Sequence, residues 1–340
     1  MVRKETAFQR LGLLFARPES SPQTRFGRPT FRLGRDEHRA IRETLRTGWV
    51  SNGEHVRRLE QHFMDRFRVR HAIATSNCTQ GLVIALRSAG LTGARVALPA
   101  FTWPSTLYAL LQNHCTPVFA DVDPETWLVD LASVRKKVDA VVAVDCFGSE
   151  AAVKAKVPVI YDAAHGYGLP RLGRRGLVEV VSLSFTKLPT AGEGGMILTN
   201  DARIAREALE LRRLSARMLE FAAVVGLNSV THYDATYLAK LQVIERYRKL
   251  LRVPFREQGV PRASNYSVFS VTFDQKAVRD RVARALAERG FETKVYYDPL
   301  VRGLKHTEAV YERILALPTY PEIARKVGQI CAIVNRAAAS

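Results

Sequence analysis

Seven short apolar runs between residues 71 and 200 constrain the fold of this chain more than any other feature. Each run is continuously apolar rather than alternating, and helical stretches separate several of them. Such runs are typical of strands buried on both faces, and strand–helix–strand repetition favours parallel strands with right-handed crossovers. The runs read HAIAT, RVALPA, PVFADV, AVVAVDCF, VPVIYDA, EVVSLSF and GMILTN. The sequence therefore predicts an α/β fold with a mostly parallel central sheet flanked by helices.

Two helices are expected before the first apolar run. One runs from about Asp36 to Arg46 and is ended by Gly48. The second is amphipathic, with apolar residues at Val56, Leu59, Phe63 and Phe67. Residues 1–30, which carry Pro, Ser and Arg without periodicity, are interpreted as an N-terminal arm.

The C-terminal third has a different pattern. It is mainly helical from about Ala202 to Val253 and continues with a strand-like stretch, SNYSVFSVTF. A helix from about Lys276 to Arg289, a second strand, FETKVYY, and helices to the end follow. We therefore expect a large domain over residues 31–240 and a smaller α+β domain over residues 241–340.

Composition limits the class of protein. The chain has 340 residues, of which 47% are hydrophobic and 25% charged, as in globular proteins. No stretch approaches the roughly 18–20 apolar residues of a membrane helix, and the N-terminal apolar run is too short for a secretory signal. These features favour a cytoplasmic protein. The cysteines are far apart and lack metal-ligand spacing, so reduced thiols and no metal site are expected; they are Cys78, Cys115, Cys146 and Cys331.

The formal net charge of +18 indicates either an anionic partner or a solvated basic surface. The charge is dispersed along the chain, without the basic, aromatic-interleaved runs of a single-strand binder. We favour the solvated surface and do not expect nucleic acid to be the partner.

Ligands of open α/β sheets bind at the carboxyl ends of the strands, so the residues after each run are the candidates for a site. After HAIAT come Ser76, Asn77, Cys78 and Thr79 and the start of a helix. Free N–H groups and the helix dipole at such a start bind phosphate. The alternative is ordinary helix capping by Ser76 or Thr79.

Trp103 follows RVALPA directly, just before Pro104 and the next expected helix. An aromatic side chain there can stack on a planar ligand or pack into the core. Asp162 and His165 follow VPVIY. An aspartate ending a buried strand is costly unless it is paired, and a protonated ring nitrogen would be a suitable partner. A structural aspartate bonded to backbone N–H groups is the alternative, and His165 is either a contact near the ligand or a structural histidine.

Lys187 lies between two predicted buried strands, just before a glycine-rich turn at residues 192–195. A desolvated lysine has a lowered pKa and becomes a nucleophilic amine suited to forming an imine. The alternative is a lysine that extends from a loop into water. The order of the parts favours the first interpretation: a phosphate-type helix start, an aromatic residue, an aspartate, and a lysine 25 residues later. That order is typical of fold-type I pyridoxal phosphate (PLP) enzymes.

Over roughly residues 30–320, the chain resembles the DegT/DnrJ/EryC1/StrS family of sugar aminotransferases. The opening segment TGWVSNGEHVRRLEQHF and the PVFADVDPETWLVD stretch are similar to those of the family. The most specific motifs are YDAAHGYG, SLSFTKLPTAGEGGMILTND and LPTYP. The resemblance implies the fold of aspartate aminotransferase, PLP as cofactor and a homodimer with composite active sites.

The resemblance also implies a role for each matched residue. Lys187 would be the catalytic lysine that binds the cofactor covalently and moves the proton. Asp162 would pair with the pyridine nitrogen, Trp103 would stack on the ring, and His165 would lie near the ring hydroxyl. The phosphate would be bound by Cys78, Thr79 and Ser182, together with Asn228 of a partner subunit.

Three features depart from the family pattern. Val230 stands where a basic residue is common, the segment after Cys146-Phe147-Gly148 is short, and Thr236-Tyr237 replaces a pair of alanines. These positions concern the donor and the substrate, and they leave the cofactor set unchanged.

The resemblance implies transfer of an amino group from an amino acid, L-glutamate above all, to C3 or C4 of a keto-sugar nucleotide. Dehydratase relatives carry histidine at the lysine position, and Lys187 argues against that branch. Transamination of a cyclitol or another non-nucleotide ketone stays open. A different class, a non-catalytic regulator or nucleic-acid binder on a PLP scaffold, would not require the complete Lys–Asp–phosphate set.

Overall fold

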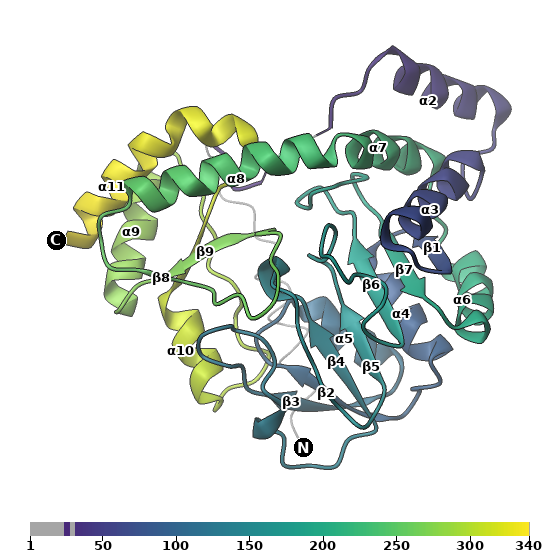
Figure 1. Cartoon of the computed structure of the whole chain (residues 1–340), viewed down its shortest axis with the longest axis horizontal. Helices are drawn as coiled ribbons and strands as arrows, with labels where there is room; N and C mark the ends of the chain where they lie inside the picture. The colour runs from purple at the N-terminus through teal and green to yellow at the C-terminus, as the bar shows by residue number, and fades with distance from the viewer. Residues whose placement is uncertain (1–23, 28–30, 340) are drawn as a thin grey trace.

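A seven-stranded sheet forms the centre of the chain, whose computed structural model describes residues 24–27 and 31–339 (Figure 1). The strand order is β1-β7-β6-β5-β4-β2-β3. Strand β7 is antiparallel to both of its neighbours, β1 and β6, and the other pairs are parallel. The strands are β1 (His71–Thr75), β2 (Arg95–Pro99), β3 (Thr116–Ala120), β4 (Ala140–Val144), β5 (Val159–Asp162), β6 (Val178–Ser182) and β7 (Gly195–Thr199). The predicted mostly parallel sheet is confirmed.

Alternate residues of the strands are buried on opposite faces of this sheet. Ile160 of β5 packs in a core with helices α4 (Cys78–Ser88), α5 (Pro104–Gln112) and α6 (Ala202–Ser215). The next residue, Tyr161, packs in a second core with helices α3 (Glu54–Phe67) and α7 (Glu220–Thr231). Burial on both faces explains why the strands are continuously apolar in sequence.

Helix α2 (Arg35–Thr47) lies beside α7 and extends beyond the body of the molecule (Figure 1). Within it only Thr44 is buried. Gly48 ends the helix with a φ of 71°, a left-handed conformation that glycine adopts without steric cost. The predicted bounds and the glycine stop agree with the structure.

The remainder of the chain forms a third hydrophobic core that begins at Val243. A small antiparallel sheet of order β10-β9-β8 lies within it. The helices and strands of this part of the chain are α8 (Tyr233–Leu250), β8 (Arg256–Glu257), β9 (Phe269–Thr272), α9 (Lys276–Glu288), α10 (Lys305–Arg313), β10 (Ile314–Leu317) and α11 (Val327–Ala339), with a 3₁₀ turn at Pro321–Lys326. The predicted domain boundary after residue 240 falls inside α8 and stays a prediction. The predicted N-terminal arm lies outside the described residues, apart from residues 24–27.

Two local predictions are wrong. FETKVYY forms no strand: Phe291 and Lys294 make isolated bridges, and the rings of Tyr296 and Tyr297 both pack on Phe147. Conversely, residues 314–317, expected to be helical, form β10. A four-residue apolar run that follows a helix without a turn signal does not reveal its conformation by periodicity.

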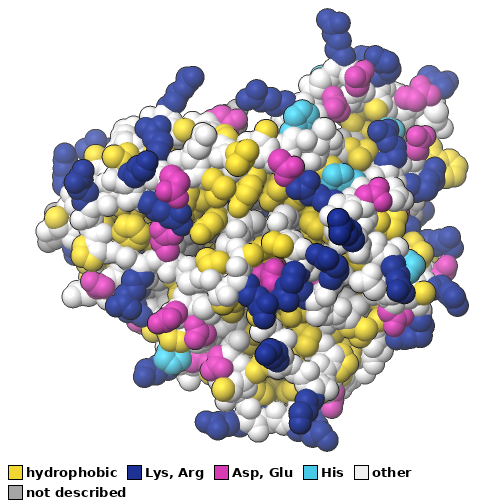
Figure 2. Space-filling view, viewed as in Figure 1, with side chains coloured by type: hydrophobic (Ala, Val, Ile, Leu, Met, Phe, Trp, Pro, Cys, Tyr) yellow, Lys and Arg dark blue, Asp and Glu magenta, His cyan; other side chains and the backbone are white. Residues whose placement is uncertain are grey.

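None of the helices in the described part of the chain is long and apolar enough to span a membrane. On the face shown in Figure 2, Lys and Arg side chains are scattered among acidic and apolar ones.

Glu220, at the start of α7, holds the start of α3 in place. Its buried carboxylate accepts hydrogen bonds from the backbone N–H groups of Gly53, His55 and Val56 at 2.7, 2.9 and 3.1 Å. Glu220→Ala leaves these donors without an acceptor, so we expect the free energy of unfolding to fall by about 2 kcal/mol. Urea denaturation measures this, with the exposed Glu210→Ala as control. Equal midpoints for the two variants would contradict the capping role.

Candidate active site

The carboxyl ends of β5 and β6 lie side by side and bring the predicted site residues together. Asp162, the last residue of β5, is paired with Val180 of β6. Ser182 ends β6 and pairs with Gly195 of β7, which also pairs with Thr75 of β1. The turn into α4 therefore begins next to the ends of β5 and β6, although these segments are about a hundred residues apart in sequence.

Lys187 lies in the loop that connects β6 to β7. The base of the loop is closed by backbone hydrogen bonds from Leu183 to Gly194 and from Ala191 to Leu183, of 2.9 and 2.8 Å. The backbone N–H of Thr190 donates to the hydroxyl of Ser229 on α7 at 3.0 Å. The Lys187 amine, Nζ, lies 2.9 Å from Nε2 of His165. The loop thus holds the amine over the end of the sheet rather than in solvent.

Burial of the Lys187 amine lowers its pKa to about 8, although Cys78, Asp162 and Glu193 favour the charged form. Only the neutral amine is a nucleophile. We therefore expect the rate at which the cofactor-free protein attaches PLP to rise about tenfold per pH unit below pH 8 and to level off above it. Stopped-flow absorbance measures this rate. A rate that still rises between pH 9 and 10 would contradict the lowered pKa.

Asp162 is buried, with 3% of its surface exposed. One carboxylate oxygen, Oδ2, accepts a hydrogen bond from the Thr106 hydroxyl at 2.6 Å, and the other accepts the N–H of Ala164 at 3.2 Å. Burial raises the pKa of Asp162, whereas these bonds and the charge of Lys187 oppose the rise. A buried carboxylate whose two partners are both neutral can hold a cationic ring nitrogen.

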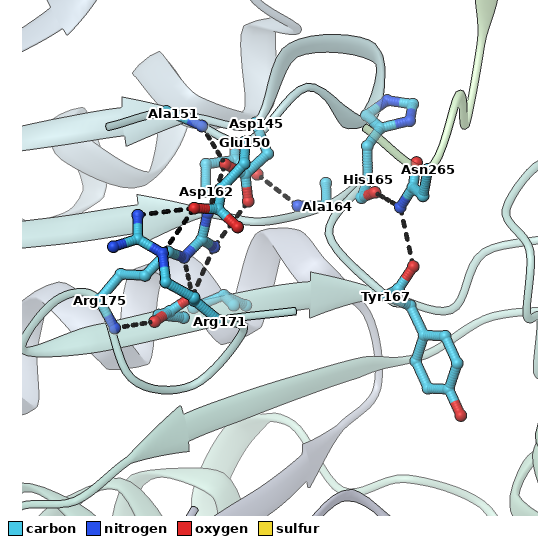
Figure 3. Close-up of polar contacts among 12 residues, drawn as sticks. Asp145, Glu150, Ala151, Asp162, Ala164, His165, Tyr167, Arg171, Arg175 and Asn265 are labelled. Carbon is cyan, nitrogen blue, oxygen red and sulfur yellow. Dashed lines mark hydrogen bonds and ion pairs between the residues drawn. The ribbon is translucent and has the colours of Figure 1, made fainter. Parts of the chain in front are cut away.

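His165 connects Lys187 to the C-terminal part of the chain. Its Nδ1 lies 2.7 Å from the hydroxyl of Ser267, and its Nε2 lies 3.4 Å from the hydroxyl of Tyr297. Asn265 donates to the carbonyl oxygens of His165 and Tyr167, as Figure 3 shows, and accepts the N–H of Ser267. Burial and then the charge of Lys187 hold the pKa of His165 well below its usual value, so the ring is neutral.

The start of α4 has the features of an anion site. Asn77 is the cap and accepts the N–H of Gln80 at 2.8 Å, so capping by Ser76 or Thr79 was the wrong alternative. No acidic residue lies in the first turn. Cys78 is buried against β6, with Sγ 3.9 Å from the carbonyl oxygen of Val180, and Thr79 is partly exposed. Ser182 ends the same strand, so the three residues predicted to bind the phosphate lie around the start of α4.

Trp103 lies before α5 and is 41% exposed, an unusual degree of exposure for so large an apolar side chain. Its ring centroid is 6.4 Å from that of Tyr297, which in turn contacts Phe101 and Phe147. Since the Tyr297 hydroxyl faces His165, Trp103 belongs to the wall of the same site.

Asn228 does not join this group in its own chain. Its side chain accepts the N–H of Arg32 at 3.3 Å and donates to Glu37 at 2.8 Å. These contacts with other described residues direct the Asn228 side chain toward α2 rather than toward Lys187. Val230, the apolar residue at the position that is often basic, is buried in the core.

A second buried ionic group lies behind Asp162 and was not predicted. Arg175 bonds to both carboxylate oxygens of Asp145 at 2.8 and 2.7 Å (Figure 3). It also bonds to Glu179. The backbone N–H of Asp145 donates to the carbonyl of Asp162 at 3.1 Å. The charge of Asp145 is one of the influences that raise the pKa of Asp162, after burial. Arg175 offsets that charge, and no motif or spacing in the sequence predicted this pairing.

These residues fit pyridoxal phosphate. A buried amine, a buried carboxylate on the neighbouring strand, a helix start free of acidic residues and an exposed indole match the aldehyde, ring nitrogen, phosphate and ring face of the cofactor. The fold and site define a fold-type I PLP-dependent transaminase. More closely, the chain belongs to the DegT/DnrJ/EryC1/StrS aminotransferase family, whose model matches residues 32–335.

Individual relatives also match most of this chain. GDP-perosamine synthase of Vibrio cholerae is 26% identical in an alignment of 330 residues, gaps included, and the match covers 85% of this chain and 88% of that protein. The crystal structure of DesI in the presence of its TDP-sugar product is 29% identical, covers 96% of each chain and has a TM-score of 0.85. The aminotransferase TlmJ from Streptoalloteichus hindustanus is 26% identical, covers 93% of this chain and 99% of its own, and has a TM-score of 0.83.

Proposed function

We propose that this protein transfers the amino group of an amino acid, L-glutamate above all, to C3 or C4 of a keto-sugar nucleotide. The observation that carries the proposal is the Lys187–His165 contact at the end of β6, beside the buried Asp162. The similarity to a GDP-sugar enzyme and to a structure with a TDP-sugar product supports a sugar nucleotide as the acceptor.

When bound, PLP supplies an electron-accepting ring that carries the amino group between the two substrates. Lys187 binds the cofactor and then serves as the base that removes the α-proton of the donor. Asp162 would keep the proton on the ring nitrogen. Trp103 would cover one ring face, and His165 would contact the ring hydroxyl. Cys78, Thr79 and Ser182 would bind the phosphate at the start of α4.

We also propose that the active form is a homodimer in which Asn228 completes the phosphate site of the partner subunit. Asn228 lies on α7 and is bound to the α2 region rather than to the cluster around Lys187. The exposed apolar residues near the end of α2, Leu45, Trp49 and Val50, provide a surface for a second subunit.

A screen of keto-sugar nucleotides against the pyridoxamine form tests the proposed acceptor. Turnover restores the pyridoxal absorbance, and we expect it with a 3- or 4-keto-sugar nucleotide. The same keto-sugar without its nucleotide and a cyclitol ketone serve as comparisons. Faster turnover of the cyclitol ketone would favour the alternative substrate class, and no turnover of any sugar nucleotide would contradict the proposal.

A further inference from the structure

Lys240 of α8 is a buried lysine that has no carboxylate partner in the described part of the chain. It is 6% exposed, and its amine, Nζ, donates to the backbone carbonyl of Ser267 at 2.6 Å. No carboxylate among residues 24–27 and 31–339 lies within ion-pair distance of it. An ammonium group has three donors, so one carbonyl leaves it incompletely satisfied.

Ser267 connects Lys240 to the active site. While the carbonyl of Ser267 accepts from Lys240, its hydroxyl lies 2.7 Å from Nδ1 of His165. His165 in turn contacts the amine of Lys187 through Nε2 at 2.9 Å. The two lysines are therefore the ends of one chain of polar contacts, Lys187–His165–Ser267–Lys240.

The electrostatics of this pair are unfavourable in the free protein. Burial lowers the pKa of Lys240 to about 7, and the charge of Lys187 contributes to the shift. Lys240 is also one of the causes, after burial and Lys187, that keep His165 neutral. Two ammonium groups in one buried site repel each other, and an anion bound at Lys240, which has no carboxylate within ion-pair distance in the described residues, would relieve the repulsion.

We propose that Lys240 anchors a carboxylate of the amino donor, and so supplies the positive charge that Val230 does not. The inference rests on the proposed function, because it assigns a residue to the donor of that reaction. A carboxylate is only a few bonds from the donor nitrogen, so it must lie near the amine of Lys187. The diphosphate of a sugar nucleotide is separated from the reacting carbonyl by the sugar ring, which makes it a less suitable partner for this position.

Three variants of the PLP-loaded protein test this. Lys240→Met removes the charge, Lys240→Gln removes it but keeps a donor for the Ser267 carbonyl, and Lys240→Arg keeps the charge. Lys249→Met, an exposed lysine on the same helix, is the matched control. L-Glutamate is titrated into each protein while the pyridoxal absorbance is followed. Glutarate, which has no amine, is titrated as a competitor to measure carboxylate binding alone.

We expect Lys240→Met and Lys240→Gln to raise the half-saturating glutamate concentration about 30-fold or more, the usual effect of removing one partner of a buried charge pair. Glutarate binding should weaken in parallel. Lys240→Arg should retain most of the binding, and Lys249→Met should behave as the unaltered protein. Saturation of the pyridoxamine form by the keto-sugar nucleotide should change little in every variant.

Unchanged glutamate and glutarate binding in Lys240→Gln would overturn the assignment. Weaker binding of the sugar nucleotide alone would also overturn it and would assign Lys240 to the diphosphate. Failure of the proposed function has a different signature. If the unaltered protein turns over no sugar nucleotide, the acceptor is wrong, and the glutamate titrations still decide the role of Lys240. If it does not respond to glutamate, the donor is wrong, and glutarate binding to the pyridoxal form decides instead.

Discussion

Replacing Lys187 with alanine is expected to reduce amino transfer by on the order of 10⁴-fold, because one amine both binds the cofactor and moves the proton. The structure gives Lys187 both properties. Its pKa of about 8 keeps a useful fraction neutral, and the contact with His165 fixes its position at the end of the sheet. Single-turnover absorbance with L-glutamate measures the loss.

Borohydride treatment identifies the amine directly. In the unaltered protein, it should attach the cofactor irreversibly to the peptide that contains Lys187, and Lys187→Ala should show no such adduct. Lys156→Ala, which removes an exposed lysine from a loop, should retain both adduct and activity. The identity of the labelled peptide is informative because Lys240 is a second buried lysine near His165. Its pKa of about 7 leaves part of this amine neutral and able to react with the cofactor. An adduct on Lys240 would show that the assignment of Lys187 is wrong.

The sheet and the residues at its strand ends were predictable from sequence because local patterns determine them. Two-sided burial leaves continuous apolar runs, and a polar residue that ends such a run must lie at the edge where ligands bind. Asp162 ends β5 and Lys187 lies in the loop after β6, and the structure places both side chains at the carboxyl ends of these strands. Their chemical roles come from the family resemblance and stay proposals.

Residues contributed by the C-terminal part of the chain were not predictable. Lys240 lies on a helix where Arg246 and Lys249 are exposed, and nothing local distinguishes it from them. Ser267 lies just before β9, and Tyr297 lies in a segment predicted to be a strand. Ser267 and Tyr297 reach His165 only through long-range packing, with 100 or more residues between the partners, and Lys240 reaches the site through Ser267. Sequence periodicity reports which face of an element is buried, not which distant element it faces.

Asn228 shows a different limit of prediction from sequence. The resemblance assigned it to the phosphate of a partner subunit, and within one chain it bonds to Arg32 and Glu37 instead. A residue that acts across an interface has no intrachain geometry to confirm it. Its role is decided by mixing subunits: an Asn228→Ala and Lys187→Ala pair should regain partial activity when mixed only if each site uses both subunits.

Asp162→Asn is expected to lower the rate constant of amino transfer on the order of 10²- to 10³-fold, the usual cost of losing one electrostatic contact to the reacting group. The substitution keeps the shape of the side chain and an oxygen that can still accept from Thr106, so the fold should be preserved. What it removes is the negative charge that holds a proton on the ring nitrogen. Stopped-flow measurement of the glutamate half-reaction gives the rate, and absorbance of the loaded protein gives cofactor retention.

Thr106→Val separates the charge of Asp162 from its hydrogen bonding. The Thr106 hydroxyl donates to Oδ2 at 2.6 Å and is one of the influences that oppose the raised pKa of Asp162. Its removal should therefore raise that pKa further, and the loss of rate should appear at low pH and recover as Asp162 ionises. Asp162→Asn has no ionisable group and should be slow at every pH. A Thr106→Val variant that is equally slow at all pH values, or an Asp162→Asn variant as fast as the unaltered protein, would contradict the assignment of Asp162 to the ring nitrogen.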